Sequence, residues 1–138
     1  MNFRNPDPVV IQALLARVKT VAVVGLSPKP DRPSFGVARA LQRFGYRIVP
    51  VRPVTTAVLG ETCYANVRDI PFPVDLVNVF RSPEFVPAVV EDAIAIGVAA
   101  IWLQDGVVHD EAALRAQAAG LTVVMDRCIY RDYMQWMS

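Results

Sequence analysis

Short apolar runs alternate with amphipathic segments along this chain, and the alternation predicts strands and helices in turn. The runs are rich in valine, isoleucine and leucine and only a few residues long, as in parallel strands that are buried on both faces. The expected strands are Val21–Gly25, Tyr46–Val51, Leu76–Phe80, Ala99–Leu103 and Leu121–Met125.

The segments between these runs carry apolar residues at helical spacing, with helix signals at their ends. Ser34 is the expected N-cap of one helix, Gly45 follows its end, and Ser82 with Pro83 begins another. The expected helices are Val9–Val18, a segment from Ser34 to Phe44, a segment from Pro83 to about Ile96, Asp110–Ala119 and part of Asp126–Met137.

Strand–helix alternation with short links is typical of a parallel sheet with right-handed crossovers. We therefore expect one Rossmann-like α/β domain over residues 1–138, with a mainly parallel five-stranded sheet and helices on both faces. Pro53–Phe72 is a long irregular stretch, so we expect a functional loop or a small decoration with some structure of its own.

Composition narrows the class of protein. Of the 138 residues, 54% are hydrophobic and 20% charged, which favours a well-filled core. The net charge of +1 lacks the strong positive excess of nucleic-acid-binding proteins. No apolar run is long enough to span a membrane and no hydrophobic signal segment is present, so we expect a cytoplasmic protein without a membrane partner.

The turn after the first strand has the composition of an anion site. Glycine lets the backbone approach a ligand, hydroxyls and cations surround it, and the next helix directs the positive end of its dipole at it. The residues concerned are Gly25, Ser27, Lys29, Arg32 and Ser34. Lys29 and Arg32 alone could be solvated charges, but the strand–turn–helix setting favours phosphate binding.

Arginine also follows other expected strands, at Arg52, Arg81 and Arg127. Because ligands of open parallel sheets bind beyond the carboxyl ends of the strands, these positions predict a ligand with several phosphates. For Arg81, a structural ion pair is an equally good interpretation.

The nucleotide is not expected to be NAD. The G-x-G-x-x-G fingerprint is absent, and the second strand ends in Val51-Arg52-Pro53 without the acid that binds ribose hydroxyls. A cation there suits a ribose that bears a phosphate, as in NADP or coenzyme A, and these residues alone do not separate the two.

Catalytic groups are sparse, and we assign no catalytic or metal-binding residue. His109 is the single histidine and is expected at an exposed helix start, and no G-x-S-x-G motif occurs. Cys63 and Cys128 form no C-x-x-C motif, and Cys128, beside Arg127, is read as a small buried side chain in preference to a reactive thiol.

Several segments together resemble the small stand-alone CoA-binding proteins, which are similar to the CoA-binding domain of the succinyl-CoA synthetase alpha subunit. The resemblance covers about residues 9 to 130 and is carried by VGLSPKPDRPS, GYRIVPV, LGE, VDLVNVFR, AAIWLQ and VVMDRC. It implies a Rossmann-like fold that binds coenzyme A as its cofactor. Synthetase activity is not implied, because the second domain of the synthetase has no counterpart here.

The resemblance also implies which residues contact the ligand. The residues that would contact the phosphates are Gly25, Ser27, Pro28, Lys29, Arg32 and Ser34. Those that would lie along the adenosine end are Val51, Arg52 and Pro53. Those that would flank the ligand are Phe80, Arg81 and Ser82. The pantetheine arm is expected near Arg81 and Trp102. One departure is Val54, where the family has a lysine, and Arg52 is the candidate to replace it.

The expected function is therefore binding of CoA or acyl-CoA. Two alternatives stay open: an NADP-linked reductase or acyl-CoA-using enzyme, and a regulatory subunit that responds to the ligand. The apolar C-terminal residues either cover a contact in a homo-oligomer or pack on the chain's own core; they are Tyr130, Tyr133, Met134 and Trp136.

Overall fold

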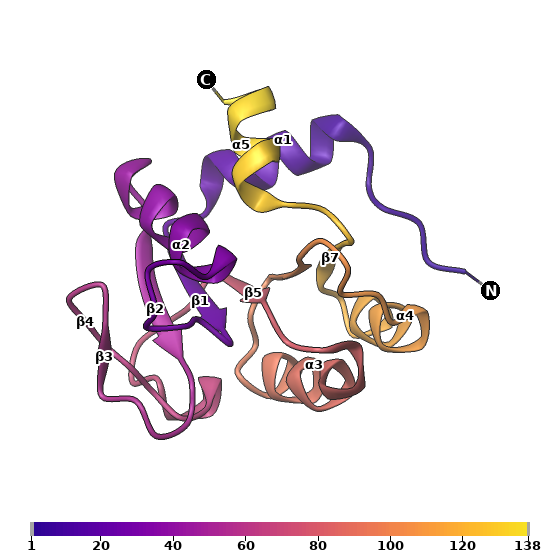
Figure 1. Cartoon of the computed structure of the whole chain (residues 1–138). Coiled ribbons are helices and arrows are strands. Elements are labelled where there is room, and N and C mark those ends of the chain that lie inside the picture. The colour runs from indigo at the N-terminus through magenta and orange to yellow at the C-terminus, as the bar shows by residue number, and fades with distance from the viewer. Residues whose placement is uncertain (1, 138) are drawn as a thin grey trace.

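A five-stranded parallel sheet forms the centre of the fold, in the order β2-β1-β5-β6-β7 (Figure 1). The computed structural model describes residues 2–137. The strands are β1 (Thr20–Val24), β2 (Arg47–Val51), β5 (Leu76–Val79), β6 (Ala100–Leu103) and β7 (Thr122–Met125), and all five expected strands are confirmed. Val24 lies opposite both Val51 and Val79, so the carboxyl ends of neighbouring strands are level with one another.

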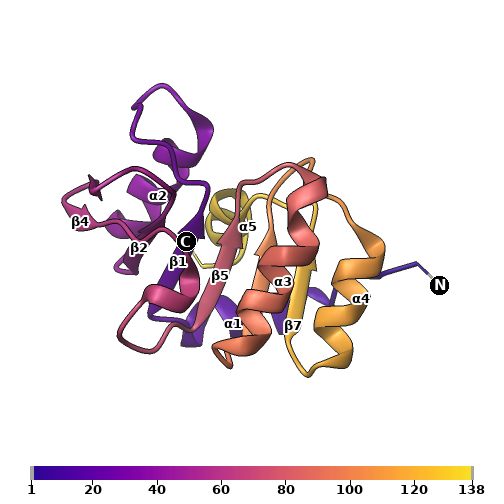
Figure 2. The same cartoon turned by 90° about the horizontal axis from the view of Figure 1, so that it is seen from below.

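Helices cover both faces of the sheet. Figure 1 shows α1 (Pro8–Arg17), α2 (Pro33–Arg43) and α5 (Ile129–Trp136) above it, and α3 (Val86–Ala95) and α4 (Asp110–Ala118) below it. Figure 2 shows α3 and α4 side by side across the lower face. The Rossmann-like α/β class expected from the sequence is therefore confirmed.

Apart from Asn78, the buried positions of the sheet are apolar because the sheet separates two cores. Ala22 and Val24 belong to the core under α3 and α4, whereas Val21 and Val23 belong to the core under α1, α2 and α5. Each strand thus supplies side chains to both layers, which explains why the runs in the sequence are continuously hydrophobic.

The stretch from Pro53 to Phe72 has structure of its own, as expected. It holds a two-stranded hairpin of β3 (Ala57–Val58) and β4 (Glu61–Thr62), followed by the 3-10 turn η1 (Val67–Asp69); a second such turn, η2 (Pro83–Phe85), precedes α3. Tyr64 pairs with the outer edge of β2, since the Arg52 N–H donates to the Tyr64 carbonyl at 2.8 Å and the Tyr64 N–H to the Pro50 carbonyl at 3.0 Å.

At the opposite edge, the segment before α1 runs beside β7 (Figure 1). The Asn5 side chain makes both backbone bonds of Met125: its amide nitrogen donates to the carbonyl at 2.9 Å and its oxygen accepts the N–H at 2.8 Å. A side-chain amide here takes the place of a neighbouring strand.

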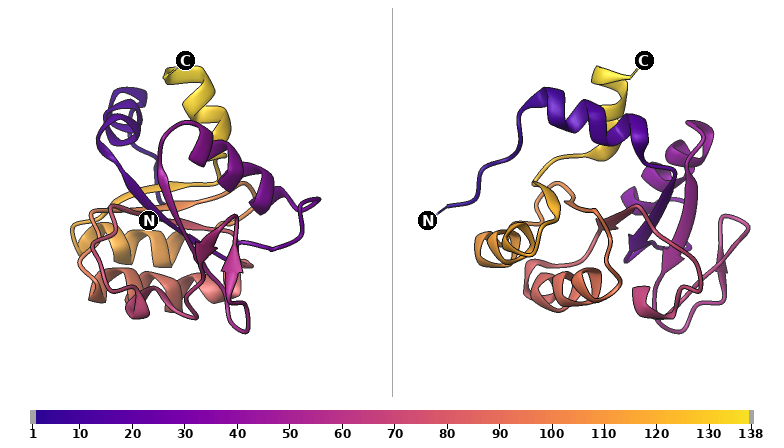
Figure 3. Two further views of the ribbon diagram at one scale, coloured as in Figure 1. Left: turned by 90° about the vertical axis from the view of Figure 1, so that its left-hand side faces the viewer. Right: turned by 180° about the vertical axis from the view of Figure 1, so that it is seen from behind.

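The C-terminal helix packs on the chain's own upper layer. Tyr133 stacks on Phe44 with ring centroids 3.9 Å apart, and the Gln12 side chain reaches the Trp136 carbonyl where α1 crosses α5 (Figure 3). Tyr130 and Met134 of the same helix are exposed. No helix within residues 2–137 is long and apolar enough to cross a membrane.

Candidate functional site

The backbone ladder of the sheet continues past the strand ends and holds the following segments at one edge. The Gly25 N–H donates to the Val51 carbonyl at 2.9 Å, and the Phe80 N–H donates to the Val24 carbonyl at 2.8 Å. The segments after β1 and β5 are therefore fixed side by side, at the switch point where the chain turns to opposite faces of the sheet.

Two adjoining cavities open at this point, with volumes of about 410 and 380 Å³. They share Gly25, Arg52 and Phe80, and we call them together the cationic hollow. Its lining is Gly25, Ser27, Lys29, Arg32, Pro33, Ser34, Arg52, Pro53, Phe80, Arg81 and Ser82. The structure thus brings together ten of the twelve residues proposed from the sequence. Pro28 is exposed outside the lining, and Val51 is buried behind it.

Gly25 has a steric reason to be glycine. Its φ is +85°, a region that favours glycine, and a Cβ built there would collide with the carbonyl oxygen of Phe80. The first turn and the segment after β5 can approach this closely only because position 25 has no side chain.

The loop between β1 and α2 is held by two serine hydroxyls. Ser34 Oγ accepts the backbone N–H of Ser27 at 3.0 Å, and Ser27 Oγ accepts the N–H of Lys29 at 3.1 Å. The sequence-based prediction that Ser34 is the N-cap of α2 is therefore wrong. Pro33, whose ring fixes a helical φ, takes the first helical position, and Arg32 becomes the cap residue.

The first turn of α2 offers fewer free donors than the sequence suggested. Pro33 has no N–H, and the N–H groups of Phe35 and Gly36 both donate to the Arg32 carbonyl. The Ser34 N–H has no partner among residues 2–137 and remains for a ligand. The positive end of the helix dipole still faces the hollow.

The positive charge of the hollow is uncompensated. Four cations line the hollow, and none of their side chains forms an ion pair with a residue among 2–137: Lys29, Arg32, Arg52 and Arg81. Of the ten other Lys and Arg side chains, four pair with a carboxylate within the described residues: Arg68, Arg115, Arg127 and Arg131. No Asp or Glu lines the hollow. Four unpaired cations in a chain of net charge +1 indicate a site for a polyanion.

Arg81 is oriented without losing its charge. Its guanidinium lies over the Phe85 ring, 4.0 Å from the ring centroid. A cation–π contact holds the side chain in place while its N–H donors stay available. The structure therefore favours the ligand-facing interpretation of Arg81 over the structural ion pair.

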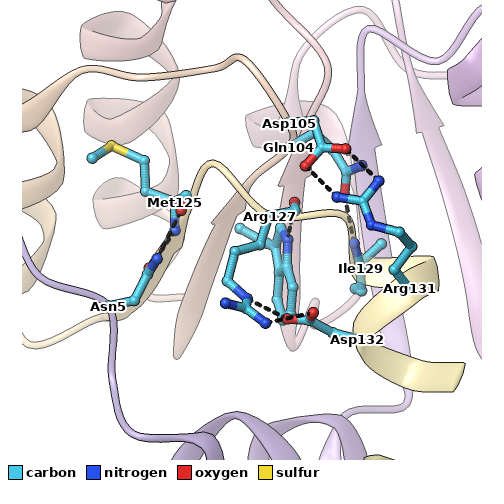
Figure 4. Close-up of polar contacts among 9 residues, drawn as sticks. Asn5, Gln104, Asp105, Met125, Arg127, Ile129, Arg131 and Asp132 are labelled. Atoms are coloured by element: carbon cyan, nitrogen blue, oxygen red, sulfur yellow. Dashed lines mark hydrogen bonds and ion pairs between the residues drawn. The ribbon is translucent and has the colours of Figure 1, made fainter. Parts of the chain in front are cut away.

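Two residues that the sequence placed near the ligand lie elsewhere. Arg127 does not join the other cations, because its guanidinium makes two bonds to the buried Asp132 carboxylate, at 2.7 and 2.9 Å (Figure 4). This hydrogen-bonded pair raises the pKa of Arg127. Trp102 is fully buried beneath α5, where its Nε1 donates to the Arg127 carbonyl at 2.8 Å, so it cannot touch a ligand in this conformation.

Groups capable of catalysis lie away from the hollow. His109 is half-buried, not exposed as expected, because its Nδ1 caps α4 by accepting the Ala112 N–H at 3.0 Å. The Cys63 thiol donates to the Arg52 carbonyl at 3.5 Å. Burial raises the pKa of this thiol despite the nearby Arg52 charge. Among the described residues, no three His, Cys, Asp or Glu side chains are grouped to hold a metal ion.

A further cavity of about 550 Å³ adjoins the cationic hollow along Pro33, Phe80 and Arg81, and we call it the side hollow. Sequence reasoning did not assign its other lining residues: Val37, Gln104, Asp105, Val107, Cys128 and Arg131. The available signal was their position, because Gln104-Asp105 and Cys128 follow the fourth and fifth strands as Arg81 follows the third.

A model of the CoA binding domain family matches residues 19–134. The chain belongs to this family. Uncharacterized protein YneT of Bacillus subtilis is 41% identical over 127 residues, covering 92% of this chain and 94% of YneT. A solved hypothetical protein from Pyrococcus horikoshii OT3 is 35% identical with a TM-score of 0.94, over 100% of this chain and 99% of that one.

The CoA binding domain also occurs within larger enzymes. Acetate–CoA ligase [ADP-forming] II of Archaeoglobus fulgidus is 32% identical over 82 residues, which cover 58% of this chain but only 12% of the ligase. In the present family member, Val54 has a fully exposed side chain outside the cavity lining, whereas Arg52 lines both parts of the cationic hollow. Arg52 is thus the cation available after β2.

Proposed function

We propose that this chain binds coenzyme A or an acyl-CoA in the cationic hollow. The observation that supports this most strongly is the set of four unpaired cations around Gly25, in a chain that belongs to the CoA binding domain family. Coenzyme A carries a pyrophosphate and a 3′-phosphate, and both need positive partners when they leave water.

The ligand would lie across the carboxyl edge of the sheet. The pyrophosphate would contact Lys29, Arg32 and the free Ser34 N–H, where the α2 dipole adds to the attraction. Arg52 and Pro53 would contact the adenosine end, with the Arg52 guanidinium near the 3′-phosphate. The pantetheine arm would pass Phe80, Arg81 and Ser82 toward the side hollow, and not toward the buried Trp102.

Isothermal titration calorimetry with CoA, acetyl-CoA, NAD and NADP tests this proposal. We expect heat with CoA and acetyl-CoA, and much weaker binding of NAD, whose ribose carries no phosphate for Arg52. If neither CoA nor acetyl-CoA binds at about millimolar concentration, the proposal is overturned. A dissociation constant of about 1 mM corresponds to a binding free energy of about −4 kcal/mol.

The same titration separates the alternatives. Tighter binding of NADP than of CoA would favour a reductase, because Arg52 after β2 also suits a 2′-phosphate. A regulatory subunit would instead retain a protein partner differently with and without CoA in a pull-down. No reaction is assigned to the cationic hollow.

A further inference from the structure

The side hollow receives residues from the carboxyl ends of three neighbouring strands. Phe80 and Arg81 follow β5, Gln104 and Asp105 follow β6, and Cys128 follows β7. It shares Pro33, Phe80 and Arg81 with the cationic hollow, so a ligand anchored there by its phosphates would have this space beside it for its other end.

Cys128 is the cysteine that lines the side hollow. It is 8% exposed, its Sγ makes no hydrogen bond to any residue in the described part of the chain, and it is the residue before the first turn of α5. Cys63 differs, because its Sγ contacts the carbonyls of Arg52 and Tyr64 and it lines neither hollow.

A second, independent feature of the side hollow points to a ligand with carbonyl groups. Gln104 is 4% exposed, and its Oε1 accepts the Ile129 N–H at 3.0 Å, next to Cys128 (Figure 4). This bond fixes the orientation of the amide, and its nitrogen donates to no residue among 2–137. Because Gln104 lines the cavity, this amide nitrogen is a donor for a ligand there, and pantetheine has two amide carbonyls that can accept from it.

Arg131 completes the surroundings of the thiol. Its guanidinium contacts the Asp105 carboxylate at 2.7 Å at the border of the same cavity. The hydrogen bond and charge of Asp105 raise the pKa of Arg131, and Arg131 lines the same cavity as Cys128. The thiol thus lies at the N-terminus of α5, in a cavity that Arg131 and Asp105 also line.

We infer that Cys128 is a site of reversible thiolation by coenzyme A disulfide, and this inference rests on the proposed function. The Cys128 thiolate attacks one sulfur of the CoA disulfide. The sulfur–sulfur bond of the reagent breaks, a Cys128–CoA disulfide forms, and one CoA leaves as its thiolate and takes up a proton. The disulfide reagent is the oxidant, and a small thiol reverses the step.

Selectivity would come from the cationic hollow. Binding of the phosphates by Lys29 and Arg32 raises the local concentration of the disulfide near Cys128. Pantethine presents the same disulfide without phosphates and lacks this advantage. We expect CoA disulfide to modify Cys128 at least about tenfold faster than pantethine at equal concentration.

The experiment follows the wild-type protein, C63S and C128S with CoA disulfide or pantethine, using intact-mass measurement and peptide mapping. We expect a CoA adduct on Cys128 in the wild type and in C63S, its removal by dithiothreitol, and its absence from C128S. Peptide mapping of the wild type identifies the modified residue even if C128S folds poorly.

Calorimetry with reduced CoA on the same samples separates this inference from the proposed function. Normal CoA binding without an adduct on Cys128, or equal rates with CoA disulfide and pantethine, would overturn the inference alone. Absence of CoA binding in the wild type would overturn the proposed function and the inference with it.

Discussion

The hydroxyl of Ser34 accepts the backbone N–H of Ser27 at 3.0 Å, and this bond joins the first turn of α2 to the loop that follows β1. Both residues are buried, so the bond is sheltered from water. The cations at positions 29 and 32 lie on the chain between its two ends. The bond therefore closes the loop that carries the proposed phosphate contacts.

Ser34→Ala should open this loop. The buried Ser27 N–H would lose its partner, so we expect the free energy of unfolding to fall by about 1–2 kcal/mol and CoA affinity to fall with it. Ser82→Ala is the matched control for stability, since Ser82 is exposed and makes no capping bond. Urea unfolding of both variants provides the measurement, and equal stabilities would contradict the role assigned to Ser34.

Gly25→Ala should damage the site through shape alone. The positive φ costs about 1–3 kcal/mol for alanine, and the collision with the Phe80 carbonyl adds to it. Gly120→Ala isolates the collision, because Gly120 also has a positive φ, +96°, but open space around its Cβ position. We expect a lower melting temperature for Gly25→Ala than for Gly120→Ala, and CoA binding lost in the first only. Equal melting temperatures and equal CoA binding in the two variants would show that the close approach of Gly25 to the Phe80 carbonyl is not required.

Arg32→Ala tests the charge of the hollow. A charge-assisted hydrogen bond is worth about 1.5–3 kcal/mol, so CoA affinity should fall by roughly ten- to hundredfold. Arg17→Ala removes the same charge from the last turn of α1, before the amino end of β1, and should leave affinity nearly unchanged. Calorimetry at two salt concentrations checks both. Unchanged affinity in Arg32→Ala would exclude Arg32 from the site.

Tyr46 gives a prediction for alkaline pH. Burial, with a smaller contribution from Tyr133, raises the pKa of Tyr46 from its ordinary value near 10 to about 12, and its hydroxyl donates to the Leu15 carbonyl at 2.6 Å. Because the folded state keeps the proton longer than the unfolded state, this stabilisation is complete below pH 10 and is lost as the pH rises through 12.

Tyr46→Phe removes that dependence. Between about pH 8 and about pH 11, the wild type should lose about 1 kcal/mol more of its unfolding free energy than Tyr46→Phe loses. Urea titrations at a series of pH values measure the difference. Parallel pH profiles would show that Tyr46 does not hold its proton more tightly in the folded state.

Asn78 is a buried polar residue in the middle of the sheet and is expected to lower the free energy of unfolding. It is 0% exposed on β5, and neither atom of its amide group has a partner among the described residues. We expect Asn78→Val to raise the unfolding free energy by about 1–2 kcal/mol, because valine carries no polar group to desolvate. Asn78→Ala, which leaves a void, should be less stable than Asn78→Val. A destabilised Asn78→Val would mean that the amide is hydrogen-bonded in solution.

The sequence predicted the elements well because the strands are buried on both faces and therefore appear as continuous apolar runs. The sequence also placed glycine, serine and cations together in the turn after β1, because they lie between a recognisable strand and helix, and the structure brings them to one hollow. The pairing of Arg127 with Asp132, five residues later on α5, could not be predicted, because it depends on how that helix lies across the sheet.

The role of Ser34 and the side hollow were missed for other reasons. A serine near a helix start is usually a cap, and only the position of Pro33 shifts the cap to Arg32. The side hollow combines residues from α2, three strand ends and α5, each of them ordinary in its own segment. The sequence placed Gln104 and Cys128 after neighbouring strands, but only the fold shows that both line one cavity.

The Asn5–Met125 contact bears on how the sheet ends. β7 is an edge strand, and exposed edges invite pairing with a strand from another molecule. A single asparagine satisfies both backbone groups of Met125, at the carboxyl end of that edge. Removing the segment before α1, or displacing it with a fused partner, would expose the Met125 backbone groups. The exposed edge would then favour pairing with a strand of another molecule. Expression tags are therefore better placed at the C-terminus than next to this segment.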